Sequence, residues 1–179
     1  MKPIRKNQTI LKNGNVNILA AFILSAFFLF PCESLILAQE TDFSGEWILN
    51  DSKSDMGQGM FRVSKAISVR QKGNDLELEK IRTGRDGQEI KSTEKLTPDG
   101  NPTVNEQGTR TTKTTVTWSD DGKSITLVSN TTFSREGQTR EMSSTEIWTL
   151  DNTGKTLTVK YSGSSPRGEQ KATLVYDKK

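Results

Sequence analysis

One stretch of sequence indicates the fold: Arg110-Thr-Thr-Lys-Thr-Thr-Val-Thr-Trp118, the turn Ser119-Asp-Asp-Gly122, and Lys123-Ser-Ile-Thr-Leu-Val-Ser-Asn-Thr-Thr-Phe-Ser134. Its apolar residues alternate with polar ones, which is the period of a β-strand with one buried face. The Asp-Gly pair supplies the positive φ that a tight hairpin turn requires. Threonine favours the extended backbone and suits a solvated face. The stretch therefore predicts an antiparallel hairpin.

The same rhythm of short alternating segments and turn signals continues from Gly45 to the end of the chain. It predicts nine strands, at residues 45–50, 62–71, 75–83, 88–97, 110–118, 123–134, 139–150, 155–162 and 169–178. Residues 98–108 are expected to be the longest polar connection and a mobile loop, and residues 51–60 a second loop. These strands could form an open sheet, a sandwich or a closed barrel, and closure is favoured because it removes exposed strand edges. The fold class is thus all-β, a single antiparallel up-and-down β-barrel of about eight to ten strands.

The first 38 residues resemble a signal peptide. Basic residues precede an apolar run from Ile18 to Phe30 that is too short to span a bilayer as a helix. We expect cleavage after Ala38, which gives a signal peptide at 1–38 and a domain at 39–179 in the periplasm or outside the cell. An alternative is lipoprotein processing at Cys32, which would tether the domain to a membrane.

Charge and composition exclude several classes of function. The net charge of +3 comes from residues 1–38, which hold four bases and one acid, so the remaining chain has equal numbers of each. Nucleic acid is therefore not an expected partner. The chain has no His and its one Cys is Cys32, so the domain lacks the residues for a Ser-His-Asp triad, a Cys-His nucleophile or a His or thiolate metal site. We expect no enzyme, cofactor or metal. Paired carboxylates at Glu94 and Glu146 are the one hydrolytic alternative.

Two short motifs carry a resemblance to a known superfamily. The first is Phe43-Ser-Gly-Glu-Trp-Ile-Leu-Asn50, and the second is Ala172-Thr-Leu-Val-Tyr-Asp-Lys-Lys179. A Gly-x-Trp on the first strand and a basic residue at the end of the last strand resemble the calycin superfamily of lipocalins and fatty-acid-binding proteins. The string from Gly45 to Asp55 is also similar to a group of secreted bacterial lipocalin-like proteins of unassigned function.

The resemblance implies an up-and-down barrel whose structural closure depends on Gly45, Trp47 and Lys178 or Lys179, with the cation over the indole. Fatty-acid-binding proteins carry Arg-x-Tyr on the last strand, and here Leu174 stands in the place of the Arg while Tyr176 is retained. That departure argues against a fatty-acid carrier of the usual kind.

Strand alternation also points many polar side chains into the barrel, where an unpaired polar group is costly. The candidate ligand-binding residues are Arg82, Glu94, Thr131, Ser144, Glu146, Trp148 and Tyr176. Alternatively the charged residues pair with one another, and the tryptophans are ordinary core residues. The sequence predicts an exported monomer that binds a small hydrophobic or amphipathic ligand without catalysis. The alternative is a cell-envelope interaction module with a filled barrel that acts through its loops, and a membrane is a partner only if Cys32 is lipidated.

Overall fold

The computed structural model describes residues 40–57, 63–84, 86–135, 137–166 and 168–179. The expected signal peptide, its cleavage site and Cys32 lie outside the described residues. Ten strands are present: β1 (Gly45–Leu49), β2 (Ala66–Lys72), β3 (Asp75–Thr83), β4 (Glu89–Leu96), β5 (Pro102–Gln107), β6 (Arg110–Trp118), β7 (Ser124–Arg135), β8 (Gln138–Leu150), β9 (Thr156–Ser165) and β10 (Gly168–Lys178). Within this part of the chain, no helix has the length and apolar character needed to cross a membrane.

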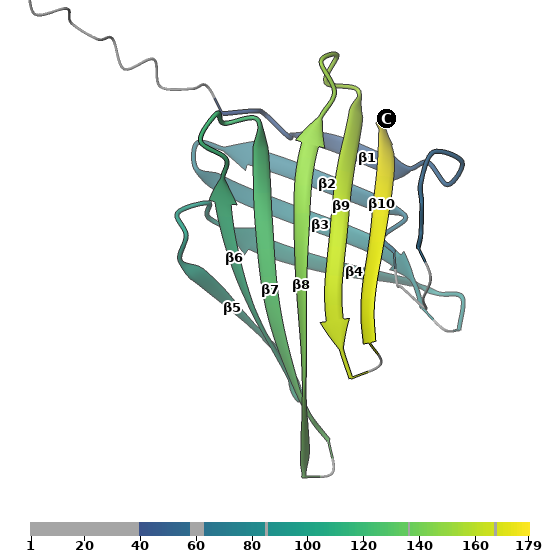
Figure 1. Ribbon diagram of the computed structural model, residues 1–179, viewed down its shortest axis with the longest axis vertical. Coiled ribbons are helices and arrows are strands. Elements are labelled where there is room, and N and C mark those ends of the chain that lie inside the picture. The colour runs from purple at the N-terminus through teal and green to yellow at the C-terminus, as the bar shows by residue number, and fades with distance from the viewer. Residues whose placement is uncertain (1–39, 58–62, 85, 136, 167) are drawn as a thin grey trace, which may run out of the picture. The chain divides into compact units, whose positions relative to one another are not determined.

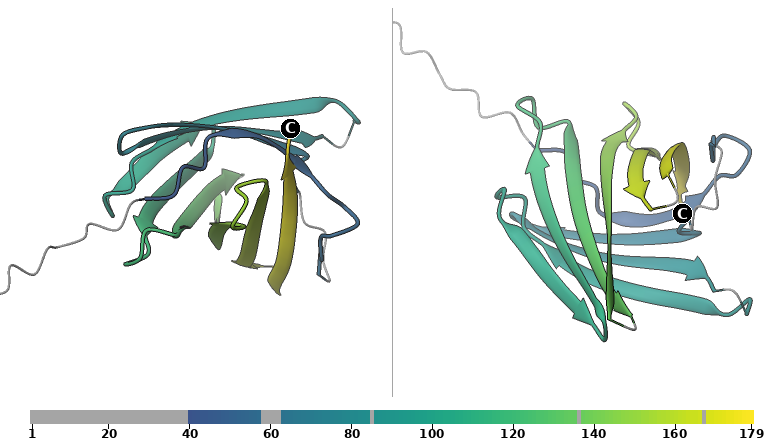
Figure 2. Two further views of the ribbon diagram at one scale, coloured as in Figure 1. Left: turned by 90° about the horizontal axis from the view of Figure 1, so that it is seen from above. Right: turned by 60° about the horizontal axis from the view of Figure 1, so that its bottom comes forward.

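The ten strands form one antiparallel sheet in the order β4-β3-β2-β1-β10-β9-β8-β7-β6-β5. Each strand pairs with its neighbour in sequence except β4 with β5, and β1 also pairs with β10, with Trp47 opposite Lys178. The sheet folds over so that β1–β4 lie across β5–β10 (Figures 1 and 2). The predicted all-β, up-and-down fold is confirmed, as a nearly closed barrel.

The hairpin between β6 and β7 shows why turn chemistry predicted the strands so well. Gly122 takes a φ of 65°, in the left-handed region that favours glycine. Asp121 Oδ1 accepts hydrogen bonds from Ser119 Oγ at 2.7 Å and from the backbone amide of Lys123 at 3.1 Å. Because these bonds are local, the turn is specified by its own residues.

The expectation of a mobile connection at residues 98–108 is wrong, because β5 lies within it. β5 pairs with β6 along its whole length, from Pro102 opposite Thr115 to Gln107 opposite Arg110. Pro102 is tolerated as the first residue of a strand at the edge of the sheet. The pairing with β6 therefore overrides the turn-forming composition of this segment.

The barrel wall has a seam, because β4 and β5 stand at the two ends of the strand order. A groove of about 290 Å³ lies between them. Its lining includes Glu94 and Thr114, which face inward, and Lys95 and Val104, which face outward. The barrel is thus nearly closed, and the two edges of its sheet approach one another without pairing.

The apolar core fills the part of the barrel next to β1. Its buried residues are Phe43, Trp47, Ile67, Val69, Leu76, Leu78, Leu96, Val116, Ile125, Leu127, Trp148, Leu157, Val159, Ala172, Leu174 and Tyr176. The Trp47 indole donates to the Phe43 carbonyl at 3.0 Å, and Phe43 stacks on Trp118. These contacts anchor the segment before β1 to the sheet.

Lys178 supplies the cation over Trp47, with its Nζ 5.1 Å from the ring centroid. Gly45 makes room for it: a Cβ at Gly45 would lie 2.6 Å from Lys178 Cε, and the φ of Gly45 is 148°. Lys179 instead forms an ion pair with Glu46 at 2.9 Å. Gly45, Trp47 and Lys178 are therefore in mutual contact where the first and last strands meet.

Candidate functional site

Along β3, β4, β6, β7 and β8 the inner face passes from the apolar core to polar side chains, with Ile90, Phe133 and Met142 as apolar residues farther along β4, β7 and β8. The inward residues are Leu76 and Leu78 then Lys80 and Arg82 on β3, Leu96 then Glu94 and Ser92 on β4, Val116 then Thr114 and Thr112 on β6, Ile125 and Leu127 then Ser129 and Thr131 on β7, and Trp148 then Glu146 and Ser144 on β8. Side chains two residues apart on a strand share a face, so these residues line one surface. We call this second part the polar half of the interior.

An ion pair crosses the interior where the two halves meet. Lys80 Nζ lies 3.2 Å from both carboxylate oxygens of Glu146, although β3 and β8 are not neighbours in the sheet. The Trp148 indole donates to Glu146 Oε2 at 2.9 Å, and Lys80 Nζ lies 5.6 Å from the centroid of the same ring. Glu146 is therefore held by a cation and an indole N–H together.

Charge and burial act in opposite directions on the pKa of Lys80. Burial lowers this pKa, because it disfavours the charged ammonium. The negative charges of Glu146 and Glu94, with the hydrogen bond to Glu146, outweigh that effect and raise the pKa above its ordinary value. Lys80 is therefore an ammonium and Glu94 lies close enough to influence it.

Hydroxyl groups satisfy one another on β6 and β7. Thr112 and Thr131 form a hydrogen bond of 3.1 Å, and Thr114 and Ser129 form one of 3.0 Å. Ser144 on β8 lies opposite Ser129 in the register. These five hydroxyl groups continue the polar half from the ion pair toward the β7–β8 hairpin, and Thr114 and Thr131 are buried.

Arg82 and Glu94 are both half-buried residues of the polar half. Arg82 Nη1 is buried and has no hydrogen-bond partner. Glu94 borders the seam groove between β4 and β5. Two large apolar side chains on the same inner face remain exposed: Ile90, opposite Arg82, and Met142, opposite Thr131. The polar half thus mixes charged, hydroxyl and apolar surface.

Trp148 and Tyr176 are fully buried members of the apolar core. The Tyr176 hydroxyl donates to the Ser64 carbonyl at 3.1 Å. Burial and the charge of Glu146 raise the pKa of Tyr176. Of the seven candidate ligand-binding residues, these two belong to the apolar core. The other five lie in the polar half: Arg82, Glu94, Thr131, Ser144 and Glu146.

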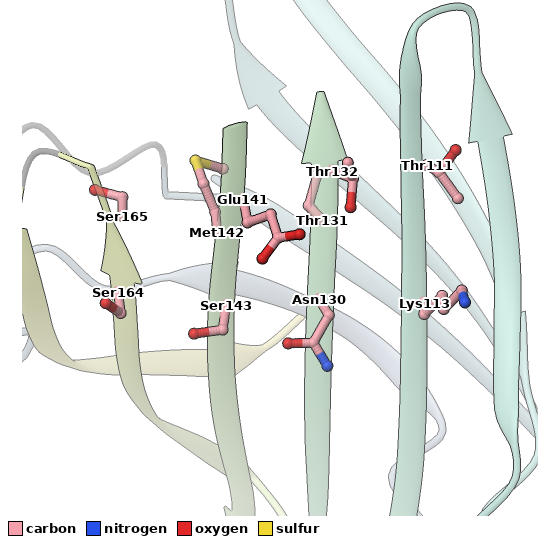
Figure 3. A pocket seen from close by; sticks show the side chains of 10 residues that line it. All are labelled: Thr111, Lys113, Asn130, Thr131, Thr132, Glu141, Met142, Ser143, Ser164 and Ser165. Carbon is pink, nitrogen blue, oxygen red and sulfur yellow. The ribbon is translucent and has the colours of Figure 1, made fainter. Parts of the chain in front are cut away.

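Sequence reasoning did not find a groove on the outer face of β6–β9. Its volume is about 530 Å³, and Figure 3 labels the residues that line it: Thr111, Lys113, Asn130, Thr131, Thr132, Glu141, Met142, Ser143, Ser164 and Ser165. Thr131 and Met142 belong to the inner face by strand alternation, and the other lining residues of β6–β8 belong to the outer face. Asn130, Ser143 and Ser164 are aligned across β7, β8 and β9 by the register. Each strand contributes only an ordinary Ser- or Thr-rich segment, so only the pairing could have revealed the groove.

The sheet order and the contact of the first and last strands define a nearly closed up-and-down β-barrel, with the cation over Trp47 that the resemblance to calycins implied. No protein-family model matches the chain, and no curated protein matches it. A comparison with solved structures finds the crystal structure of zebrafish ileal bile acid-binding protein complexed with cholic acid, at 12% identity and a TM-score of 0.46, covering 76% of this chain and 98% of that one. A similarity this low supports no conclusion about a ligand of this chain.

Proposed function

We propose that this protein is exported as a monomer and binds a small amphipathic molecule in the polar half of its barrel, without transforming it. The observation that carries the proposal is the change along the inner face of β3, β4, β6, β7 and β8 from the apolar core to a surface of mainly polar side chains. A surface that combines apolar area with a few convergent polar groups is typical of small-molecule sites.

The exposed inner-face side chains give the proposal its amphipathic character. Ile90 and Met142 are each 36% exposed, beside Arg82 and Thr131 respectively. Contact with an apolar chain would remove this area from water, at a gain of about 25 cal/mol per Å². The hydroxyl and charged groups next to them would hold the polar end of the same molecule.

We propose binding without catalysis because Glu146, one of the two carboxylates of the hydrolytic alternative, already has hydrogen-bond partners within the protein. It accepts hydrogen bonds from both Lys80 and Trp148. A carboxylate held as the partner of a buried ammonium is poorly suited to accept or donate a proton in a reaction. Its role in the proposal is to keep Lys80 charged and Trp148 in place.

The test is native mass spectrometry of the protein purified from the periplasm after expression of the full chain, beside a lipid extract of the same sample. The expected spectrum shows a monomer that begins at Gln39 and carries an adduct lost on denaturation. A bare polypeptide that also binds no amphiphile in solution would overturn the proposal. A protein that retains a lipidated Cys32 would overturn the cleavage after Ala38 and leave the binding site unchanged.

A second candidate function is the cell-envelope interaction module, and the groove on the outer face of β6–β9 favours it (Figure 3). Two adjacent residues of β8 separate the candidates: Ser144 faces inward and Ser143 lines the outer groove. Ser144→Trp would fill the polar half, and Ser143→Trp would fill the groove. We expect Ser144→Trp to abolish uptake of the adduct and Ser143→Trp to leave it intact; the reverse would favour the second candidate.

A further inference from the structure

Arg82 is a cation of the polar half whose buried Nη1 has no hydrogen-bond partner among the residues that the structure describes. It lies two residues beyond Lys80 on β3 and therefore faces the same side of the strand. Its Nη1 is buried without a hydrogen bond, and among the described residues no carboxylate forms an ion pair with it. An unsatisfied buried donor on a charged group is costly and is rare in folded proteins.

Lys80, on the same strand and the same face, is a cation that has a partner within the protein. Its ammonium pairs with Glu146 at 3.2 Å, and Glu94 adds a second negative charge nearby. The carboxylate of Glu146 therefore interacts with Lys80 and Trp148, and it forms no ion pair with Arg82. The two neighbouring cations therefore differ, since Lys80 has a carboxylate partner and Arg82 has none among the described residues.

Further basic side chains follow on the inner face toward the β7–β8 hairpin. Arg110, Phe133 and Arg140 form one row across β6, β7 and β8. The Arg110 guanidinium lies 5.1 Å from the centroid of the Phe133 ring. By strand alternation the described residues beyond Glu146 on this face of β6–β8 include no carboxylate. The end of the polar half therefore carries the basic side chains of Arg110 and Arg140 beside the aromatic surface of Phe133.

We infer that the amphipathic ligand carries an anionic oxygen group, a carboxylate or a sulfate or phosphate ester, which binds to the Arg82 guanidinium. This inference rests on the proposed function and names its ligand class. A guanidinium presents a planar fork of N–H donors that matches two oxygens of such a group. The apolar chain of the ligand would then contact Ile90, opposite Arg82, and the surface around Phe133.

The test compares two probes of equal chain length, dodecanoate and dodecanol, by isothermal titration of the purified, delipidated protein. We expect dodecanoate to bind at least about tenfold more tightly than dodecanol, since hydrogen bonds to charged groups are stronger than those between neutral groups. Arg82→Gln should remove most of that preference while leaving dodecanol affinity unchanged. Arg70→Gln is the matched control, because the Arg70 side chain is 80% exposed and pairs with Glu77 outside the barrel.

The outcomes distinguish a failure of the anionic ligand class from a failure of the proposed ligand-binding function. If both probes bind equally, or if Arg82→Gln weakens both to the same extent, the anionic class is overturned and the binding function stands. If neither probe binds, the proposed function fails with it. Arg82→Lys, which keeps the charge without the fork, should give an intermediate preference and serves where Arg82→Gln does not fold.

A merely structural role for Arg82 predicts a different result in the absence of ligand. Because its Nη1 is buried without a partner, we expect Arg82→Met to unfold at an equal or higher urea concentration than the unsubstituted protein. A clear loss of stability in Arg82→Met would show that Arg82 serves the fold and would overturn the inference.

A second measurement uses vesicles of phosphatidylglycerol. If the protein cosediments with these vesicles but does not bind dodecanoate, its anionic ligand is a membrane surface, and the inference of a ligand held inside the barrel is overturned.

Discussion

Lys80 on β3 and Glu146 on β8 form an ion pair of 3.2 Å across the barrel interior, between strands that are far apart in the sheet order. Both side chains are about one fifth exposed, so solvent screens the pair only partly. A buried pair of this kind contributes less through its own attraction than through the penalty that follows when one partner is removed.

We therefore expect Glu146→Gln to destabilise the fold by about 3 kcal/mol, because it leaves the Lys80 ammonium without its carboxylate. Urea denaturation followed by tryptophan fluorescence measures the change. The double variant Lys80→Met with Glu146→Leu should recover most of the loss. The matched surface pair is Lys91 and Glu79, separated by 3.6 Å and well exposed, where Glu79→Gln should cost less than about 1 kcal/mol. Equal costs at the two sites would contradict the prediction.

The two tyrosines of the chain, Tyr161 and Tyr176, should titrate late. Burial and the charge of Glu146 raise the pKa of each, while Lys80 partly opposes this at Tyr161. In the folded protein the tyrosinate absorbance should therefore appear at a pH above the ordinary value of 10.0, and urea should return it to that value. A native midpoint at 10.0 would contradict the burial of both side chains, and Tyr161→Phe isolates the signal of Tyr176.

Stability should fall at alkaline pH for the same reason. A group whose pKa is raised on folding contributes stability that is fully present below its unfolded pKa and is lost as the pH rises through its folded pKa. Tyr161, Tyr176 and Lys80 all have raised pKa values, with ordinary values of 10.0 and 10.5. We expect the free energy of unfolding to decline above about pH 10, and Tyr176→Phe to reduce the decline. A free energy of unfolding that stays constant through this range would contradict it.

Gly45→Ala should loosen the junction of the first and last strands. A Cβ at Gly45 would displace Lys178 from Trp47, and the positive φ of Gly45 strains any other residue. Lys178→Met removes the cation alone and should cost about 0.5–1 kcal/mol, the value of an exposed cation–π contact. Lys179→Met is the control, since Lys179 forms only a surface ion pair with Glu46. Thermal unfolding should rank Gly45→Ala as the most destabilising of the three.

The hydrogen bond between Thr114 and Ser129 should show strong coupling in a double-mutant cycle. Thr114 is buried, so Ser129→Ala leaves its hydroxyl without its partner at a cost of about 1–3 kcal/mol. Thr114→Val together with Ser129→Ala removes both polar groups and should be nearly neutral. Additive losses in chemical unfolding would show that each hydroxyl is independently hydrated.

The sequence predicted the hairpins because their causes are local. Alternation sets which side chains face inward, and turns such as Asp121-Gly122 are closed by their own hydrogen bonds. The same local reasoning placed Arg82, Glu94, Thr131, Ser144 and Glu146 on the inner face, where the structure has them. It failed at β5, whose composition favours turns and whose extended form depends on pairing with β6.

Tertiary structure alone decided which inward residues meet. Lys80 and Glu146 are 66 residues apart and lie on strands that are not neighbours, so only the folding of the sheet onto itself brings them together. The same holds for the seam between β4 and β5 and for the outer groove, which aligns residues from four strands. Local period and turn chemistry therefore determined the strands and their faces, whereas the curvature of the sheet determined that Lys80 has a partner and Arg82 does not.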